Sequence, residues 1–362
     1  MKKIVFILLL IIIPFKVKAI SASSYIVMDY NSNRVLEGSN INDKKLIASI
    51  TKIMTCIIAL ENSDINQEVE VSSEVLKSYG SGIYIEIGEK LTLEDLLYGL
   101  MLRSGNDAAL EIARVVSKSQ EEFVKLMNLK AKDLGMNNTL FINDSGLEDN
   151  KGDGNKSSSY DMAILMSYAL KNDKFKEIIS TKRKIVKSSH KTYDWYNKNK
   201  LLTDYKYCIG GKTGFTKKAR RTLVTAASKD DKTIIIVTLN DPNDFSNHKN
   251  LYESSFKKYN LITILNKDLF NLKDVDYNGR VYIKDDFKML LTKSEENKIT
   301  IDYEMKKNGS YNDEDVVGIA HIKLNNNEIN TVAIYLDTNN KKNIKKEKNW
   351  FLKLIDYIIF WR

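Results

Sequence analysis

The order of strand-like and helix-like segments restricts the fold of this chain more than any other feature of its sequence. Residues 25–29 and 34–37 flank a polar turn and predict an antiparallel hairpin. Residues 222–228 and 233–239 flank a charged turn and predict a second hairpin. Helical patterns lie between the hairpins, at residues 93–102, 120–134 and 159–170. Strands at both ends of a helical region predict an α/β fold, an antiparallel sheet with a helical insertion.

The composition changes after a further predicted helix at residues 247–259. Short alternating runs follow, separated by turn residues, and predict a small all-β domain with sandwich-like packing. A chain of 362 residues is also long for one hydrophobic core. We therefore predict two domains, at residues 24–262 and 275–338.

The first residues have the pattern of an export signal. Lys2 and Lys3 precede an apolar run at residues 4–13, which is too short to span a bilayer. Val17-Lys18-Ala19 has the pattern of a cleavage site for signal peptides. We predict that residues 1–19 are a signal peptide, with an uncleaved anchor as the alternative. In both cases the rest of the chain acts outside the cytoplasm.

The last residues, 341–362, form a basic and amphipathic tail. A lysine-rich stretch at residues 341–348 precedes an apolar segment that contains Trp350 and Trp361 and is too short to cross a bilayer. This pattern is typical of a segment that lies in the membrane interface. We predict peripheral membrane attachment, with a last helix packed on the β domain as the alternative.

The net charge of +9 reflects 56 Lys and Arg against 47 Asp and Glu. Together with export, this charge favours an anionic wall or lipid surface as partner, and no nucleic acid. Cys56 and Cys208 do not make a disulfide framework and stand in no metal-ligand spacing. We expect small buried thiols at both positions, although a single bridge between them stays open.

Ser49 and Lys52 lie in a segment, residues 46–60, that would be apolar on nearly every face of a helix. Such a helix is buried, and a spacing of three places both side chains on one face. Burial and the positive end of the helix dipole lower the pKa of a lysine and favour the neutral amine. A neutral amine beside a hydroxyl is a general base beside a nucleophile. The spacing is weak evidence alone, because Ser-x-x-Lys is frequent in unrelated chains.

Two further short motifs follow in the order that this chemistry requires. Ser104-Gly105-Asn106 comes after the helix that ends at residue 102 and brings a second hydroxyl and a carboxamide, although it is also ordinary turn chemistry. Lys212-Thr213-Gly214 opens the strand that runs into residues 222–228. We expect it on an edge strand, where the glycine lets a peptide backbone approach. A charged strand start is the alternative.

In this order the three motifs resemble those of the penicillin-binding proteins. In particular, the chain resembles the low-molecular-mass penicillin-binding proteins, the serine-type D-alanyl-D-alanine carboxypeptidase family. The resemblance covers most of the sequence after the export signal, including residues 90–106, 141–147 and 211–216. It also includes the glycine in the middle of the second motif.

This resemblance implies a reaction. Ser49 would attack the carbonyl between the two terminal D-alanines of a peptidoglycan stem peptide, with Lys52 as proton acceptor. Ser104 would pass the proton to the leaving amine, and water would then hydrolyse the acyl-enzyme. The reaction requires no metal and no cofactor. β-Lactam antibiotics would be covalent inhibitors.

The resemblance also implies binding roles. Asn106 would orient the donor peptide, and Lys212 and Thr213 would bind its terminal carboxylate. Gly214 would allow the peptide backbone to approach. The backbone N–H groups of Ser49 and Phe215 would form the oxyanion hole.

Two segments depart from the family pattern. Asn143-Asp144-Ser145-Gly146 lacks the proline of the family's form, and Ala219-Arg220-Arg221 has arginine where glycine is common. Both lie outside the three motifs. We therefore expect them to affect fine substrate preference more than the reaction.

Other activities stay open. A DD-endopeptidase or a transpeptidase would have the same fold, and a non-catalytic wall-binding scaffold would keep the fold without turnover. A β-lactamase is disfavoured, because no clear Glu-x-x-x-Asn motif lies between the second and third motifs. A Ser-His-Asp protease is also disfavoured, because His190, His248 and His321 lie outside the motif regions.

Overall fold

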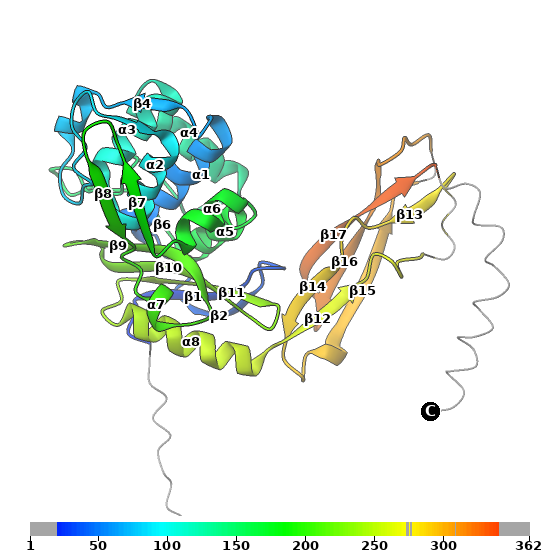
Figure 1. Cartoon of the computed structure of the whole chain (residues 1–362). Helices are drawn as coiled ribbons and strands as arrows, with labels where there is room; N and C mark the ends of the chain where they lie inside the picture. Colours follow the sequence, from blue (N-terminus) through cyan, green and yellow to red (C-terminus); the bar gives the residue numbers. More distant parts are fainter. Residues whose placement is uncertain (1–19, 273–274, 276, 308, 340–362) are drawn as a thin grey trace, which may run out of the picture.

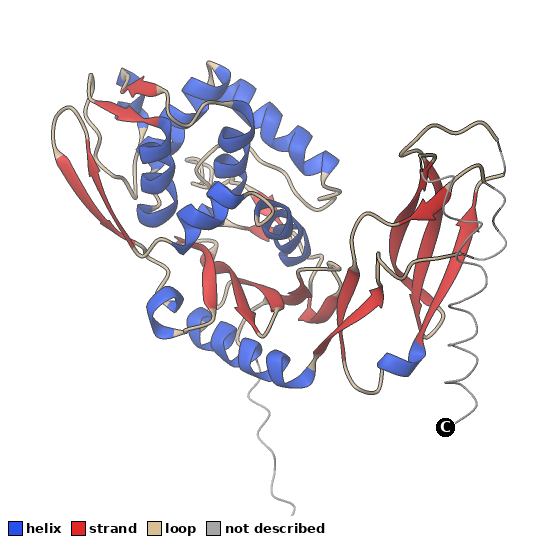
Figure 2. Ribbon diagram, turned by 45° about the vertical axis from the view of Figure 1, so that its right-hand side comes forward, coloured by secondary structure: helices blue, strands red, loops and turns tan. Residues whose placement is uncertain are grey.

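The computed structural model describes residues 20–272, 275, 277–307 and 309–339. These residues form a larger domain of helices and strands and a smaller domain of β-strands (Figure 1, Figure 2). The predicted signal peptide and C-terminal tail lie outside the described residues. Within the described part of the chain, no helix has the length and apolar character that a membrane crossing needs.

A five-stranded antiparallel sheet forms the base of the larger domain. Its order is β2-β1-β11-β10-β9, so the first hairpin pairs with the last and β9 lies at one edge. Both predicted hairpins are therefore confirmed, within the α/β fold that was expected. The strands are β1 Ser24–Asp29, β2 Val35–Ser39, β9 Cys208–Thr216, β10 Arg220–Lys229 and β11 Lys232–Leu239.

Alternate residues of each strand enter separate cores on the two faces of the sheet. On β1, Ile26 and Met28 pack against the helical insertion, whereas Val27 packs on the opposite face. Helix α5 contacts β1 and β11 on the first face, and α8 contacts β10 and β11 on the second. The helices are α1 Lys52–Asn62, α2 Leu93–Tyr98, α3 Asn106–Ser117, α4 Gln120–Asp133, α5 Ser159–Ala169, α6 Asp173–Ser180, α7 Leu201–Asp204 and α8 Asp244–Lys258.

Hydroxyl side chains begin three of the helices that the sequence predicted, α2, α4 and α5. Thr92 accepts a hydrogen bond from the Asp95 N–H and forms a capping box at the start of α2. Ser119 and Ser158 cap α4 and α5 in the same way. Several other elements were not predicted: α3, α6, α7 and the hairpin of β7 Arg183–Lys187 with β8 Thr192–Tyr196, as well as the short pairs β3 Lys45–Leu46 with β6 Lys156–Ser157 and β4 Glu68–Glu70 with β5 Lys90–Thr92.

The smaller domain packs a two-stranded and a four-stranded sheet around one core, in agreement with the predicted all-β domain. Its start differs from the prediction. The first strand, β12, pairs with β14 and so belongs to this domain, which begins at about residue 260 instead of 275. The strands are β12 Asn260–Leu265, β13 Arg280–Tyr282, β14 Phe287–Leu291, β15 Ile299–Met305, β16 Val316–Leu324 and β17 Asn327–Asp337.

Polar contacts join the smaller domain to the β1–β2 turn. The buried Asp29 carboxylate accepts a hydrogen bond of 2.9 Å from the Leu290 N–H. Arg34 donates to the Leu290 carbonyl at 2.8 Å and also pairs with Glu295. Because β9 forms the opposite edge of the sheet, these contacts lie away from the third motif.

Candidate active site

Ser49 lies in a 3-10 turn, Ala48–Thr51, directly before α1. The sequence had predicted one continuous helix. Ala48 has a φ of +50°, a left-handed conformation that is rare for a residue with a side chain. Gly146 packs against this turn, since a Cβ added there would lie 2.0 Å from the Ala48 carbonyl oxygen. This close packing holds the backbone from which Ser49 faces the cleft.

Lys52 is fully buried, and its side-chain nitrogen lies among three oxygens. Nζ is 3.3 Å from Ser49 Oγ, 2.7 Å from Asn106 Oδ1 and 2.6 Å from the Ser145 carbonyl oxygen. Burial lowers the pKa of Lys52 to about 7, against the opposing effect of the Asp144 carboxylate. The amine is therefore substantially neutral near neutral pH.

The three oxygens around Lys52 can all accept from its ammonium form, and they take different roles when the amine is neutral, with two N–H donors and one lone pair. The Asn106 and Ser145 oxygens only accept, so they take the two donors. The lone pair then faces Ser49, whose hydroxyl has a proton to give. The predicted proximity of Ser49 and Lys52 is thus present, in a geometry that suits proton transfer.

Ser104 lies at a break between two helices. α2 continues into a π-helical turn, Gly99–Arg103, and Ser104 follows with a φ of +64° before α3 begins. Its hydroxyl lines the cleft and makes no hydrogen bond with a described residue. A Cβ at Gly105 would lie 2.9 Å from Asp107 Oδ1, so the middle position of the motif has little room for a side chain.

The Asn106 carboxamide connects Lys52 to a neighbouring loop. Its Oδ1 accepts from Lys52, and its Nδ2 donates to the Tyr79 carbonyl at 2.6 Å. The residue is only 3% exposed. Asn106 therefore holds Lys52, and one of its Nδ2 hydrogens has no partner among the described residues.

Lys212, Thr213 and Gly214 lie in the middle of β9. The predicted strand running on into residues 222–228 was wrong, because the chain turns at residues 217–219 and β9 pairs antiparallel with β10. The position at a sheet edge is confirmed. A Cβ at Gly214 would lie 3.0 Å from the Ser49 nitrogen, so β9 passes directly beside the nucleophile.

Lys212 is buried, with 1% of its surface exposed. Its Nζ donates to the Thr213 carbonyl at 2.8 Å. Burial lowers the pKa of Lys212 well below the usual lysine range, and the charges of Lys52 and Lys198 lower it further. The third motif therefore places a poorly solvated amine beneath the edge strand.

A cleft of about 420 Å³ lies between these elements. Five residues predicted for the site line it: Ser49, Ser104, Thr213, Gly214 and Phe215. The other three, Lys52, Asn106 and Lys212, are buried residues adjoining it. Six lining residues were not predicted as part of the site: Ser81, Lys198, Lys200, Arg221, Asp244 and Phe245.

Both segments that depart from the family pattern adjoin the motifs in space. The Ser145 carbonyl accepts a hydrogen bond from Lys52, and Arg221 lies opposite Phe215 in the pairing of β9 with β10. The segment Ala219-Arg220-Arg221 thus included one of the missed residues, Arg221. Asp244 and Phe245 carried no motif that could have identified them.

The histidines lie away from Ser49. His248 is buried between α8 and the sheet, where it pairs with Thr225 and Thr238, and burial lowers its pKa to about 3. His190 and His321 lie beside carboxylates outside the cleft. Cys56 and Cys208 are free thiols. Among the described residues, no group of His, Cys, Asp and Glu is arranged to hold a metal ion.

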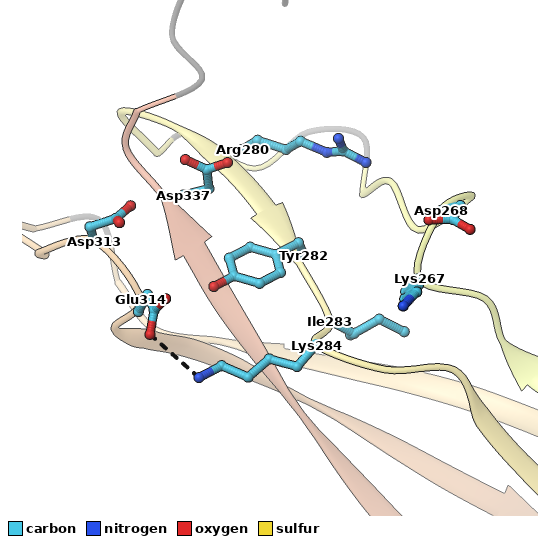
Figure 3. Close-up of a pocket in the computed structure, with 9 residues that line it drawn as sticks. All are labelled: Lys267, Asp268, Arg280, Tyr282, Ile283, Lys284, Asp313, Glu314 and Asp337. Atoms are coloured by element: carbon cyan, nitrogen blue, oxygen red, sulfur yellow. Dashed lines mark ion pairs between the residues drawn. The ribbon is translucent and has the colours of Figure 1, made fainter.

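A second hollow, of about 540 Å³, lies in the smaller domain beside β13 and the end of β17 (Figure 3). It is lined by charged residues of both signs, two of which, Lys284 and Glu314, form an ion pair at 3.5 Å. No serine or cysteine lines it. It therefore lacks the nucleophile that the cleft beside Ser49 provides.

Comparison with known families identifies the larger domain. Residues 14–243 match the family model for D-alanyl-D-alanine carboxypeptidase. The chain belongs to this family. Residues 259–342 match the model for the C-terminal domain of penicillin-binding protein 5, which agrees with a second domain that begins near residue 260. The larger domain is therefore a peptidase domain of the D-alanyl-D-alanine carboxypeptidase family.

Individual relatives agree with this assignment. The chain is 36% identical to D-alanyl-D-alanine carboxypeptidase DacF of Bacillus subtilis over 222 residues, which are 60% of this chain and 56% of the relative. It is 31% identical to a D-alanyl-D-alanine endopeptidase of Haemophilus influenzae over 66% of this chain and 80% of that one. The structure of penicillin binding protein 5 from Haemophilus influenzae has the same fold, with a TM-score of 0.75 and 23% identity over 88% of this chain and 97% of that chain.

Proposed function

We propose that this protein removes the terminal D-alanine from peptidoglycan stem peptides through an acyl-enzyme on Ser49. The observation that carries the proposal is the position of Lys52 beside Ser49, together with its lowered pKa. Its nitrogen lies 3.3 Å from Ser49 Oγ, and burial lowers its pKa to about 7. Such a lysine takes a proton from the serine at neutral pH without help from a histidine.

Acylation proceeds by attack on the carbonyl between the two D-alanines. Ser49 Oγ bonds to the carbonyl carbon as its proton passes to Lys52 Nζ. The carbonyl oxygen becomes negative and accepts hydrogen bonds from the backbone N–H groups of Ser49 and Phe215. The C–N bond then breaks, Ser104 relays the proton from Lys52 to the leaving amine, and D-alanine departs.

The substrate binds along the edge of β9. Its backbone pairs with the free side of this strand, which passes close beside Ser49 because residue 214 is glycine. Asn106 donates its remaining Nδ2 hydrogen to the peptide. Lys212 and Thr213 contribute to the end of the site that receives the terminal carboxylate.

Deacylation uses the same groups. A water molecule takes the place of the departed D-alanine, gives a proton to Lys52 and attacks the ester carbonyl. Ser49 then leaves with a proton from Lys52. Transfer of the acyl group from Ser49 to an amine, in place of water, would make the enzyme a transpeptidase. Cleavage of a peptide bond inside a longer or cross-linked peptide would make it an endopeptidase.

Intact-protein mass spectrometry of the purified chain with benzylpenicillin, alongside D-alanine release from a peptide ending in D-Ala-D-Ala, tests the proposal. We expect one penicilloyl group on the peptide that contains Ser49, and release of free D-alanine. An adduct without release of D-alanine would favour an endopeptidase or transpeptidase. The absence of an adduct would favour a non-catalytic scaffold.

The pKa of Lys52 predicts the pH dependence of acylation. Below its pKa of about 7, Lys52 is protonated and cannot accept the Ser49 proton, whereas above it the amine is free. The value of kcat/KM should therefore rise with pH through an apparent pKa of about 7 to a plateau, because this parameter reports the free enzyme. Acylation rates with benzylpenicillin, measured between about pH 5 and 9, check this. Rates that do not change over this range would contradict the role of Lys52.

We also propose that the enzyme works at the outer face of the cell membrane. The support is the basic and amphipathic sequence at residues 341–362. Sedimentation with anionic lipid vesicles should be strong for a chain that includes this tail and weak for one that ends at residue 339. Equal sedimentation of the two chains would refute attachment through the tail.

A further inference from the structure

The carboxylate end of the cleft needs a cation that keeps its charge. Lys212, the residue assigned there by its motif, is buried, and its pKa is lowered well below the usual lysine range. Its Nζ is already bonded to the Thr213 carbonyl. Lys212 on its own is therefore a weak partner for the carboxylate of a peptide.

The register of the sheet places Arg221 beside the third motif. Arg221 on β10 lies opposite Phe215 on β9, and Leu223 lies opposite Thr213. Residues two apart on a strand share a face, so the Arg221, Phe215 and Thr213 side chains all lie on one face of the sheet. A diagonal cross-strand neighbour is within reach of a long side chain, which brings the guanidinium to the edge that Thr213 occupies. All three residues line the cleft with Ser49.

Arg221 is held in place from the side of α8. Its Nη2 donates to Asp244 Oδ1 at 2.8 Å, and its guanidinium lies 5.3 Å from the centre of the Phe245 ring. Asp244 is nearly fully buried at the start of α8, whereas 41% of the Arg221 side chain is exposed. A buried carboxylate and a ring thus position a guanidinium that still has free N–H donors facing the cleft.

The other cations of the cleft are less suited to this task. Burial lowers the pKa of Lys198, as does the charge of Arg103, and its Nζ donates to the Ser81 hydroxyl at 3.3 Å. Lys200 has no positioning partner among the described residues. An arginine keeps its positive charge throughout the pH range of the experiments. Its planar guanidinium can also donate two parallel hydrogen bonds to a carboxylate.

We propose that Arg221, positioned by Asp244 and Phe245, binds the terminal carboxylate of the substrate and makes the enzyme select peptides with a free C-terminus. Thr213 completes the site, with Lys212 behind it. The inference rests on the proposed carboxypeptidase function and adds its specificity-determining residue. The group recognised is a carboxylate one residue beyond the scissile bond, which benzylpenicillin also presents.

Two peptides and two variants test this proposal. The peptides are acetylated and end in D-Ala-D-Ala or in its C-terminal amide, and the released D-alanine or D-alaninamide is measured. Arg221→Gln should lower kcat/KM for the free acid by roughly 10²-fold, the usual effect of losing a charged hydrogen-bond partner, and should change the amide little. The matched control, Arg220→Gln, removes the same charge from the adjacent exposed residue, which does not line the cleft, and should leave both values unchanged.

The ratio of the two kcat/KM values separates a binding role from a structural one. A damaged fold would lower both values together, so an unchanged ratio in Arg221→Gln would overturn the proposal, whether or not activity falls. If the wild type releases nothing from either peptide, the carboxypeptidase function fails. The role of Arg221 is then decided by the rates at which benzylpenicillin and its methyl ester acylate Ser49, where only the free acid should lose rate in the variant. Without acylation of the wild type, both proposals fall.

Discussion

Replacing Ser49 by alanine is expected to abolish both D-alanine release and the penicilloyl adduct, a loss on the order of 10⁶-fold for removal of a catalytic serine. The physical reason is that Ser49 Oγ is the oxygen that lies 3.3 Å from the neutral lysine. Intact-protein mass spectrometry and the D-alanine assay measure the two losses. The variant should keep the fold, since a small hydroxyl facing the cleft is removed.

The control for this variant is Ser117→Ala on α3. The Ser117 hydroxyl is buried without a partner among the described residues, so its loss should leave the stability and activity almost unchanged. An adduct that persists in Ser49→Ala on another residue would show that the nucleophile was misassigned.

Replacing Lys52 by glutamine should slow acylation of Ser49 by roughly 10²–10⁴-fold, the contribution of a positioned general base. Glutamine keeps N–H donors for the Asn106 and Ser145 oxygens. A side chain without such donors would leave both oxygens buried without a hydrogen-bond partner. It cannot accept the serine proton. The rate of penicilloyl formation, followed by mass spectrometry with time, measures the effect.

The pH profile decides whether Lys52 is a base or only a structural residue. In the wild type, the acylation rate should rise through a pKa of about 7, and in Lys52→Gln this rise should disappear. A variant that is slow but keeps the same rise would assign the titrating group elsewhere. Lys45→Gln, on a lysine paired with Asp43 outside the cleft, controls for the loss of one positive charge.

Local sequence patterns determined a large part of the fold. The hairpins of β1–β2 and β10–β11 follow from alternation around polar turns, and α2, α4 and α5 begin at capping hydroxyls that can be read directly. Such signals depend on residues that are close together in the sequence, so they can be recognised without the tertiary structure.

Elements with weak local signals were missed. The hairpin β7–β8 has a charged sequence, with Arg183 and Asp194 paired across it, and it packs through Val186, Tyr193 and Trp195 on the helical insertion. Strand β12 was not predicted, and the predicted larger domain ended within it, at residue 262. Only its pairing with β14 shows that it belongs to the smaller domain. In both cases long-range packing decides the structure, and periodicity over a few residues does not reveal it.

The sequence by itself indicated the proposed reacting groups: Ser49 and Lys52 three residues apart, and the two later motifs in the expected order. Only the tertiary structure decided how they work. Lys52 has a pKa of about 7 because residues distant in the sequence exclude water from it, including Asn106 and Ser145. Arg221 reaches the cleft because β10 pairs with β9 in one register and α8 supplies Asp244. Burial and pairing are properties of segments brought together in space, so a linear pattern names the residues without fixing their charge or their neighbours.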